Sequence, residues 1–493
     1  MNILLVYPRY PETFWSFDHA LKFIGKKSSY PPIGLLTVAA MLPKEWNLKL
    51  IDLNVSNIKD EDILWSDYVF ISGMTVQKLS AENIIARCIS LNRKVVAGGP
   101  LFAGEPENFP EVHHLFLNEA EITLPQFLHD LDLGCPKSIY QNSEWADITA
   151  TPVPLWDLIN LKNYATMCVQ SSRGCPHDCE FCDITVLFGR KTRIKPVNNV
   201  INELEALYQK GWRGNVFFVD DNFIGNKVVV KNELLPAIIK WMKKRKYPFT
   251  FLTQVTITLA NDDVLMNLMA QAGFNTVFVG IETPDKESLI ECGKFHNTKC
   301  NMTENVKKLQ TSGLQVYGGF IVGFDSDKED IFTRIVHFIN ESGIVNSMVG
   351  LLNALPNTRL YKRLAKENRI IKNSTGNNTD FSINFLPKMD YNILIDGYRK
   401  LLEDIYNPEV YYNRIRTFLR NYKIVQKFNK RFSLTDLRAL IMSLYKLGIK
   451  SKVRKHFWKL IMWTLLRRPR TIHVALTLAI YGEHFMRYYK TIV

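Results

Sequence analysis

Near the middle of the chain stands the stretch Ser172-Arg173-Gly174-Cys175-Pro176-His177-Asp178-Cys179-Glu180-Phe181-Cys182, in which three cysteines are spaced C-x3-C-x2-C. Thiolates are the usual ligands of iron-sulfur clusters, and three of them in one loop can reach three corners of a cubane, which leaves the fourth iron open. The alternatives are a zinc site completed by His177 and three unrelated thiols. Structural zinc loops more often pair two C-x2-C knuckles. The spacing therefore favours a 4Fe-4S cluster on Cys175, Cys179 and Cys182.

Six β-rich runs follow one another around and after this loop, and segments with helical periodicity separate them. Such alternation builds parallel sheets, because a helix must return the chain to the start of the next strand. Six units fall short of the eight that close a barrel. We therefore predict a partial parallel barrel over residues 146–365. Its expected strands are 167–170, 215–219, 250–254, 276–281, 315–322 and 347–352.

Residues 1–145 show the same alternation with shorter runs, which predicts a doubly wound, flavodoxin- or Rossmann-like parallel sheet. A proline-rich linker, residues 151–154, follows it. Ligands of such sheets bind beyond the carboxyl ends of the strands. The turns after the strands therefore supply the candidate ligand-binding residues, which are Met74, Thr75, Gly98, Gly99 and Glu119. The expected strands are 3–6, 48–51, 68–72, 95–97 and 114–117.

The last part of the chain, residues 366–493, predicts helices and is strongly basic. From Tyr411 to Val493 there are 19 lysines and arginines against two acidic residues, whereas the whole chain has a net charge of +14. Its most apolar run, residues 471–481, is shorter than the roughly 20 residues that cross a bilayer. Basic residues mixed with aromatic and aliphatic ones favour contact with an anionic membrane surface, ahead of plain packing on the barrel and of nucleic-acid binding.

The bulk composition, 46% hydrophobic and 22% charged, is that of a globular protein. Eight cysteines in 493 residues are too sparse for a disulfide-rich secreted scaffold. The N-terminal run, residues 1–8, has no basic leader and is too short for a signal peptide. We therefore expect a cytoplasmic protein that is peripheral to the inner face of the membrane if its basic tail binds lipid.

Three further motifs follow the cysteine loop along the predicted barrel. The second strand leads into two adjacent carboxylates, the fourth into Gly280-Ile281-Glu282-Thr283, and the fifth is the glycine-rich run 318–324. Each has an ordinary explanation alone, as solvated turn residues, a helix N-cap and a β-bulge. In this order they resemble the radical S-adenosylmethionine superfamily, which also carries an aromatic residue just before the third cysteine. The resemblance implies that the residues binding S-adenosylmethionine are Phe181, Asp220, Asp221, Glu282, Gly319 and Gly323.

The whole chain is similar to the superfamily's subgroup with an N-terminal cobalamin-binding-type domain, and its helical end is similar to that of relatives of the hopanoid methylases. The similarity implies that the N-terminal turns bind cobalamin. Many cobalamin domains supply a histidine to cobalt through Asp-x-His-x-x-Gly, but Asp52-Leu53-Asn54 has no histidine. In the radical methylases that histidine is commonly missing too. A flavodoxin-like domain kept for packing or substrate recognition is the alternative.

The resemblance also implies a reaction. A cluster reduced by a ferredoxin- or flavodoxin-type donor would convert S-adenosylmethionine to a 5′-deoxyadenosyl radical, and cobalamin would methylate the carbon from which that radical removes hydrogen. With the basic tail, this favours a lipid substrate, isoprenoid or hopanoid-like, ahead of a peptide or natural product; we expect no nucleic-acid partner. Radical chemistry without methyl transfer and a non-enzymatic scaffold with a structural metal are the remaining classes.

Overall fold

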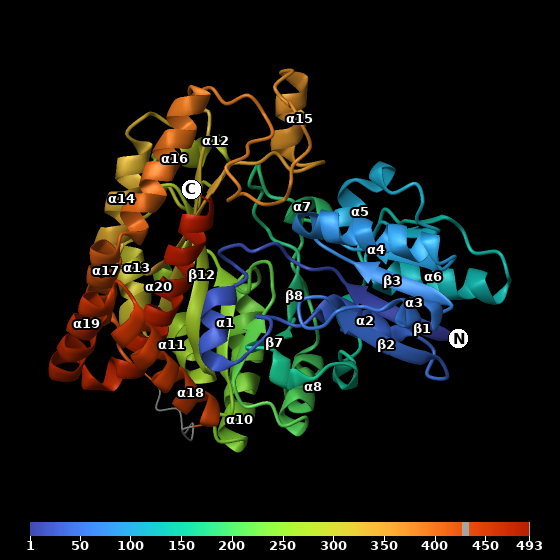
Figure 1. Ribbon diagram of the computed structural model, residues 1–493, viewed down its shortest axis with the longest axis horizontal. Coiled ribbons are helices and arrows are strands. Elements are labelled where there is room, and N and C mark those ends of the chain that lie inside the picture. Colours follow the sequence, from blue (N-terminus) through green and yellow to red (C-terminus); the bar gives the residue numbers. More distant parts are fainter. Residues whose placement is uncertain (426–432, 493) are drawn as a thin grey trace.

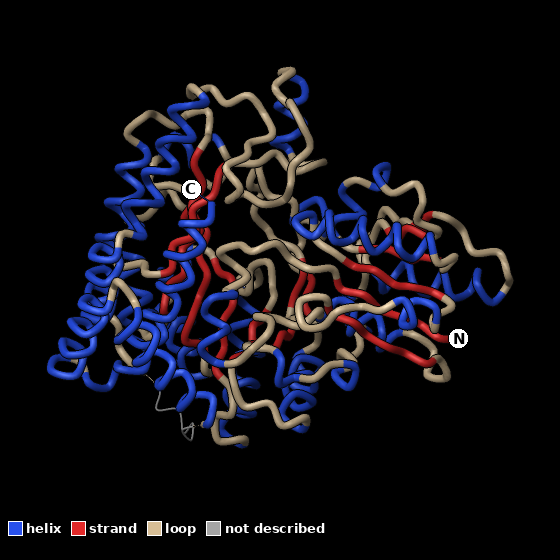
Figure 2. The backbone as a smooth tube through the Cα atoms, in the orientation of Figure 1, coloured by secondary structure: helices blue, strands red, loops and turns tan. Residues whose placement is uncertain are grey.

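A computed structural model describes residues 1–425 and 433–492 and divides them between two lobes (Figure 2). Each lobe contains one six-stranded sheet, and neighbouring strands within each sheet run parallel. Parallel strands need crossover connections, and helices supply most of these here. The predicted α/β class, with a doubly wound sheet before a partial barrel, is confirmed.

The smaller lobe holds a sheet in the order β2-β1-β3-β4-β5-β6. Its central strand β1 is apolar from Ile3 to Val6 because both faces are covered: Leu4 and Val6 pack into one layer with α4 and α5, and Ile3 and Leu5 into the other with α2 and α6. The strands are β1 (Asn2–Tyr7), β2 (Asn47–Asp52), β3 (Tyr68–Ser72), β4 (Lys94–Gly98), β5 (His114–Phe116) and β6 (Ile139–Tyr140). The helices are α2 (Ile33–Met41), α3 (Asp60–Leu64), α4 (Lys78–Ser90), α5 (Pro100–Gly104) and α6 (Ala120–Asp132).

The larger lobe holds the partial barrel, whose strands follow one another in chain order from β7 at one edge to β14 at the other. Burial alternates along β13, where Val316, Phe320 and Val322 are buried and Tyr317 and Ile321 are partly accessible on the other face. The strands are β7 (Thr166–Val169), β10 (Asn215–Phe218), β11 (Thr250–Val255), β12 (Phe274–Glu282), β13 (Gln315–Val322) and β14 (Asn346–Leu351). A separate antiparallel pair, β8 (Ser172–Arg173) and β9 (Arg193–Ile194), was not predicted.

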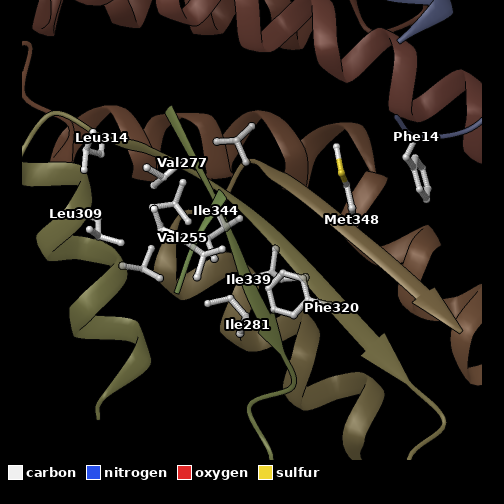
Figure 3. Packing of buried hydrophobic residues seen from close by; sticks show 14 of the residues in the cluster. Phe14, Val255, Val277, Ile281, Leu309, Leu314, Phe320, Ile339, Ile344 and Met348 are labelled. Atoms are coloured by element: carbon white, nitrogen blue, oxygen red, sulfur yellow. The ribbon is translucent and has the colours of Figure 1, made fainter. Parts of the chain in front are cut away.

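Helices cover the outer face of this sheet. Figure 3 shows the packed layer, in which Leu309 of α13 and Ile339 of α14 lie against side chains of the strands such as Val277 and Phe320. The helices that connect the strands are α7 (Ile184–Leu187), α8 (Val197–Gln209), α9 (Lys227–Val229), α10 (Leu235–Lys244), α11 (Asp263–Ala272), α12 (Lys286–Glu291), α13 (Met302–Thr311) and α14 (Ile331–Ser342).

The segment between β1 and α2 leaves its own sheet and packs into the barrel. It contains α1 (Asp18–Ile24), which Figure 1 shows beside the barrel strands and the C-terminal helices rather than beside β1. The Trp15 ring lies 5.0 Å from that of Phe278 on β12, and the Tyr30 ring lies 5.4 Å from that of Phe217 on β10. Aromatic side chains of the N-terminal region therefore occupy the interior of the barrel.

The C-terminal helices close the open side of the barrel. Tyr481 of α20 lies 6.5 Å from Tyr317 of β13, and Phe485 lies 5.5 Å from Tyr406 of α16. None of the helices in residues 1–425 and 433–492 is both long and apolar enough to span a bilayer. Residues 426–432 of the predicted basic tail lie outside the described residues. The helices are α15 (Arg359–Lys366), α16 (Tyr391–Tyr406), α17 (Pro408–Asn421), α18 (Leu434–Ser443), α19 (Arg454–Arg467) and α20 (Ile472–Ile492).

Candidate active site

The cysteine loop leaves the barrel at the carboxyl end of β7 and returns through β9. Its two ends are held together by the β8–β9 pair. Gly174 has a φ of 88°, and a Cβ at this position would lie 2.7 Å from the Lys191 carbonyl oxygen. Glycine is required there because the left-handed backbone and the close approach of the returning strand both exclude a side chain.

The three thiols of the loop share one environment. Burial raises the pKa of Cys175, Cys179 and Cys182, and the nearby Lys294 ammonium lowers the pKa of the first two. Cys182 is close enough to both other cysteines that their charges would raise its pKa further. Among the described residues, no three His, Cys, Asp or Glu side chains are arranged to hold a single metal ion. A cubane cluster needs its thiolates further apart than a single metal ion does, because each thiolate binds a separate iron atom.

The two adjacent carboxylates after β10 have different surroundings. Asp220 is fully buried, and its oxygens accept hydrogen bonds from the backbone N–H groups of Ser171 (2.7 Å) and Ser172 (3.1 Å) and from both serine hydroxyls. Asp221 accepts one, from the Gly174 N–H at 2.7 Å, and burial raises its pKa to about 7. Asp220 therefore anchors the entry to the cysteine loop, whereas Asp221 keeps acceptor capacity beside it.

Glu282 forms a buried ion pair with Lys294, a residue that the sequence motifs did not single out. Glu282 has a φ of 63° at an irregularity in the β12–β13 register, which turns the carboxylate toward the cysteine loop. Asn297 donates to the carbonyl oxygens of Gly280 and Ile281, both at 3.2 Å, while its own side-chain oxygen is buried without a partner. A buried acceptor without a donor is unusual, so the Asn297 side-chain oxygen beside Glu282 is free to accept a hydrogen bond from a ligand.

The glycines predicted on β13 lie in two different settings. A Cβ on Gly319 would lie 2.7 Å from the Phe278 ring, so this glycine makes room for an aromatic side chain of the barrel. Gly323 has a φ of 108°, and its N–H donates to Asp327 at 2.8 Å. Phe181 lies 6.2 Å from Phe324, which follows Gly323. The aromatic residue before the third cysteine and the end of β13 are therefore neighbours.

A cavity of about 680 Å³ lies where the two lobes meet. From the cysteine loop it is lined by Phe181 and Cys182, and from the smaller lobe by Asn54 and Met74, which follow β2 and β3. The barrel contributes Ile321, Leu351 and Leu352, and the N-terminal segment contributes Trp15 and Tyr30. The ligand-binding ends of both parallel sheets thus face a common space, as expected for sheets of this kind.

Of the other residues predicted in the smaller lobe, Thr75 lies at a contact with the C-terminal region, whereas Gly98 and Gly99 pack inside the lobe. A Cβ on Gly376, in the loop between α15 and α16, would lie 2.6 Å from the Val76 N–H nitrogen and 2.8 Å from the Thr75 Cβ, so the two backbones touch here. Gly98 packs against Phe116, and Gly99, with a φ of 96°, lies against Ser72. Of the five predicted residues in this lobe, Met74 alone is among those lining the large cavity.

Glu119 joins the smaller lobe to the cysteine loop. Its carboxylate accepts from Arg173 at 2.9 Å, from Arg193 at 2.8 Å and from the Ala146 N–H at 2.8 Å, and Glu121 pairs with Arg173 at 2.7 Å. Arg173 and Arg193 are the residues of the β8–β9 pair, so these buried ion pairs hold the base of the loop. Through these ion pairs, Glu119 links the smaller lobe to the cysteine loop.

We expect the substitution Arg173→Met to destabilise the protein by about 3–5 kcal/mol, because it leaves buried carboxylates without their partner. The loss should appear as a lower thermal midpoint and as faster proteolysis between the lobes. The control is Arg399→Met, which removes an exposed pair with Asp396 and should cost no more than about 1 kcal/mol. Equal shifts in the two variants would contradict the structural role of Arg173.

A second network of ion pairs connects the cysteine loop to α15. Arg363 donates to Glu180 at 2.7 Å and to Asp325 at 2.9 Å, and Arg369 also pairs with Asp325. Burial would raise the pKa of Asp325, but hydrogen bonds from the two arginines outweigh it and lower the pKa to about 2. The cysteine loop is therefore held by charges at its base and also on its outer side.

Comparisons with known proteins identify the family of this chain. The profile of the Radical SAM superfamily matches residues 169–339, and a domain of unknown function, DUF4070, matches residues 358–493. An uncharacterised methyltransferase of Synechocystis sp. is 40% identical, covering 99% of this chain and 92% of that protein. The hopanoid C-2 methylase of Rhodopseudomonas palustris is 31% identical, covering 94% of this chain and 90% of that protein.

Among solved structures, the fold resembles OxsB, a cobalamin-dependent S-adenosylmethionine radical enzyme, with a TM-score of 0.64 and 16% identity over 99% of this chain and 83% of that chain. It also resembles the radical S-adenosylmethionine methyltransferase TsrM from Kitasatospora setae, with a TM-score of 0.63 and 14% identity over 95% of this chain and 99% of that chain. The fold similarity spans both lobes. With relatives 40% and 31% identical along nearly their whole length, the chain belongs to the radical S-adenosylmethionine methyltransferase family and is an enzyme.

Proposed function

We propose that this enzyme is a cobalamin-dependent radical methyltransferase that acts on an unactivated carbon of a lipid. The observation that carries the proposal is the cavity between the lobes, which is lined by Cys182 on one side and by Asn54 and Met74 on the other. Ligands of such sheets bind beyond the carboxyl ends of the strands, so this space would let a cofactor of the smaller lobe and a cluster on the loop act on one substrate.

The residues fit the cofactors that the family uses. Cys175, Cys179 and Cys182 would hold a 4Fe-4S cluster, and Asp220 would keep their loop in place through Ser171 and Ser172. When bound, the cluster and S-adenosylmethionine supply a 5′-deoxyadenosyl radical and cobalamin supplies the methyl group. Asp221, the Glu282–Lys294 pair and the turn at Gly323 are the groups we assign to S-adenosylmethionine, with Phe181 beside them.

The smaller lobe fits a corrinoid that takes no nitrogen ligand from Asn54. This residue stands where Asp-x-His-x-x-Gly has its histidine, and its amide group is occupied by Asp52 at 2.7 Å, by the Pro8 carbonyl at 3.2 Å and by the Tyr10 N–H at 2.9 Å. Asp52 in turn accepts from Tyr164 at 2.9 Å. Asn54 therefore shapes the wall of the cavity, and Met74 adds an apolar contact beside it.

The lipid substrate is supported by the cavity wall and by the relatives. Leucine, isoleucine and aromatic side chains form much of the lining, which suits an apolar molecule. The 31% identical relative is named a hopanoid C-2 methylase. A peptide side chain or another natural product is the second substrate class, and radical chemistry without methyl transfer is the second reaction class.

Anaerobic reconstitution tests the reaction. We expect the purified protein to bind cobalamin and to form both 5′-deoxyadenosine and S-adenosylhomocysteine with its substrate, because one S-adenosylmethionine yields the radical and another renews the methyl group. The products are measured by liquid chromatography with mass spectrometry. Formation of deoxyadenosine alone by cobalamin-loaded enzyme would remove methyl transfer from the proposal and leave the second reaction class.

The electron donor needs access to the cluster, and a second cavity of about 540 Å³ lies on the outer side of the loop. Its lining includes the basic residues Arg190, Lys299 and Arg359, and His177 stacks there on His296 with ring centroids 3.9 Å apart. Positive charge around a site favours association with an acidic partner. We assign the docking of an acidic ferredoxin- or flavodoxin-type donor to this face.

The charge reversals Arg190→Glu and Lys299→Glu together should slow reduction by an acidic flavodoxin about tenfold or more, because they remove electrostatic steering. Reduction by dithionite should not change. The matched control is Lys243→Glu with Lys244→Glu, at the end of α10 and thus at the opposite ends of the strands. If the control slowed reduction as much, donor docking would not lie at this cavity.

A further inference from the structure

The helix α18 and its π-helical continuation (Leu444–Lys450) carry an apolar stripe that faces solvent. Leu434, Leu437, Ile441, Tyr445 and Ile449 follow one another at intervals of three or four residues, and their exposed fractions range from 42% to 86%. Residues at this spacing lie along one side of a helix. In a surface helix such a stripe normally faces the core, so its exposure here calls for a partner.

Helix α19 carries a second exposed stripe. Trp458, Met462, Leu465 and Leu466 are 42% to 77% exposed, although Phe457 and Leu460 on the other side of the helix are buried. The Trp458 indole N–H donates to the Gly448 carbonyl at 2.9 Å, which fastens α19 to the end of the preceding helix. The two stripes therefore belong to one structural unit, residues 433–467, which we name the α18–α19 hairpin.

Basic side chains accompany the stripes. Residues 433–470 contain one acidic residue, Asp436, and its carboxylate accepts from Ser433 at the start of α18. The exposed cations of this region are Arg438, Lys450, Lys452, Arg454, Lys455, Lys459, Arg467 and Arg470. Apolar and aromatic side chains with a basic surround suit the boundary of an anionic bilayer, where rings lie at the headgroups and cations meet phosphates.

We propose that the α18–α19 hairpin is a monotopic membrane anchor, which lies on an anionic lipid surface without crossing it. Helix α18 has 10 residues and its π-helical continuation has 7, and α19 has 14, so the continuous helix over 434–450 and α19 are both short of a bilayer span. A second copy of the chain is a poorer occupant, because pairing the same face would bring its cations together. Nucleic acid would satisfy the cations but would leave the aliphatic stripes exposed to water.

The hairpin also connects to the large cavity. Helix α1 begins at Asp18, which lines the cavity, and is followed by Gly25, where a Cβ would lie 2.6 Å from the Arg438 guanidinium of α18. The Lys446 ammonium lies 5.0 Å from the Phe23 ring of the same helix. Figure 1 shows α18 and α19 at the edge of the larger lobe, away from the smaller sheet. The anchor therefore holds the larger lobe at the membrane and is joined to the cavity by one short helix.

Flotation of the full-length protein tests the anchor, with vesicles of phosphatidylcholine containing about 30% phosphatidylglycerol, and with vesicles of phosphatidylcholine alone. We expect binding to the anionic vesicles, which weakens about tenfold or more in the variant Leu434→Ser, Ile449→Ser and Leu466→Ser. The charge variant Lys452→Glu, Lys455→Glu and Lys459→Glu should weaken it similarly and in addition lower its sensitivity to salt. These side chains are exposed, so the variants should keep their thermal midpoint and iron content.

The matched control replaces three other apolar residues that are more than half exposed, Leu133→Ser, Val264→Ser and Leu386→Ser, and should float as the unaltered protein does. Absence of flotation by the unaltered protein, or unchanged flotation of the α18–α19 triple serine variant, would overturn the proposal. It would also be overturned by a dimer that the triple serine variant dissociates, or by RNA binding with flotation absent. Each readout is independent of methyl transfer, so failure here leaves the proposed reaction untouched.

Discussion

Replacement of Cys175, Cys179 and Cys182 by alanine should lower the iron content from about four atoms per chain to less than about one, because all three protein ligands of the cluster are lost. Cleavage of S-adenosylmethionine should then be undetectable, since the electron has no route to the sulfonium. Iron is measured by elemental analysis of anaerobically reconstituted protein, and cleavage by the yield of 5′-deoxyadenosine. The brown colour of the protein should disappear as well.

The control is the pair Cys135→Ala and Cys300→Ala, which removes two cysteines that the loop does not contain. This variant should keep its iron and its activity. Persistence of about four iron atoms per chain in the triple alanine variant would show that other residues hold the cluster. Cys292 would then be examined first, because its carbonyl accepts from the Glu180 N–H at 2.8 Å and a charge on Cys179 would raise its pKa.

The second large effect is expected from Asp220→Ala. This substitution leaves the buried N–H groups of Ser171 and Ser172 without an acceptor, at about 1–3 kcal/mol for each group. The protein should lose about 2–6 kcal/mol of stability, and the cysteine loop should bind markedly less iron. Asp220→Asn should restore most of the iron, because its amide oxygen still accepts from both N–H groups and the serine hydroxyls can rotate to accept from its NH₂ group.

The substitution Asp221→Ala distinguishes the role of Asp221 from that of Asp220. It removes a single hydrogen bond, from Gly174, so iron content and thermal midpoint should change little. The affinity for S-adenosylmethionine should fall about tenfold, as expected for the loss of a charge-assisted contact of about 1.5 kcal/mol or more. Binding is measured by calorimetry under anaerobic conditions. Equal loss of iron in the two alanine variants would contradict the distinction between positioning and binding.

The local pattern of apolar residues in the sequence predicted many of the strands. The runs 68–72 and 315–322 coincide with β3 and β13, because buried strands with helices on their faces are continuously apolar or alternate with a period of two. The short strands of the β8–β9 pair escaped prediction, since two residues carry no period. The course of residues 13–30 escaped it as well, because the contacts of Phe14 with Phe485 and of Trp15 with Phe278 form only in the folded chain.

The contacts of the individual site residues could not be predicted from the local sequence pattern. Asp220 and Asp221 look alike in the sequence, yet one accepts four hydrogen bonds from the protein and the other accepts one. Glu119 has the sequence position of a ligand-binding turn residue, and in the fold its carboxylate pairs with arginines 54 and 74 residues away. Lys294 had no motif to mark it, and its buried pair with Glu282 depends on how the chain turns after α12.

By itself, the sequence determined the chemistry that the protein can hold and the class of its fold: the spacing of three thiolates within one loop is a local property, and the periodicity of a strand or helix involves residues at most a few positions apart. Only the tertiary structure decided what surrounds that chemistry. The cavity between the lobes, the charges that clamp the loop and the exposed stripes of α18 and α19 arise from residues far apart in the chain. Packing and ion pairing between residues far apart in the chain stabilise the fold, but they produce no periodic pattern in the sequence.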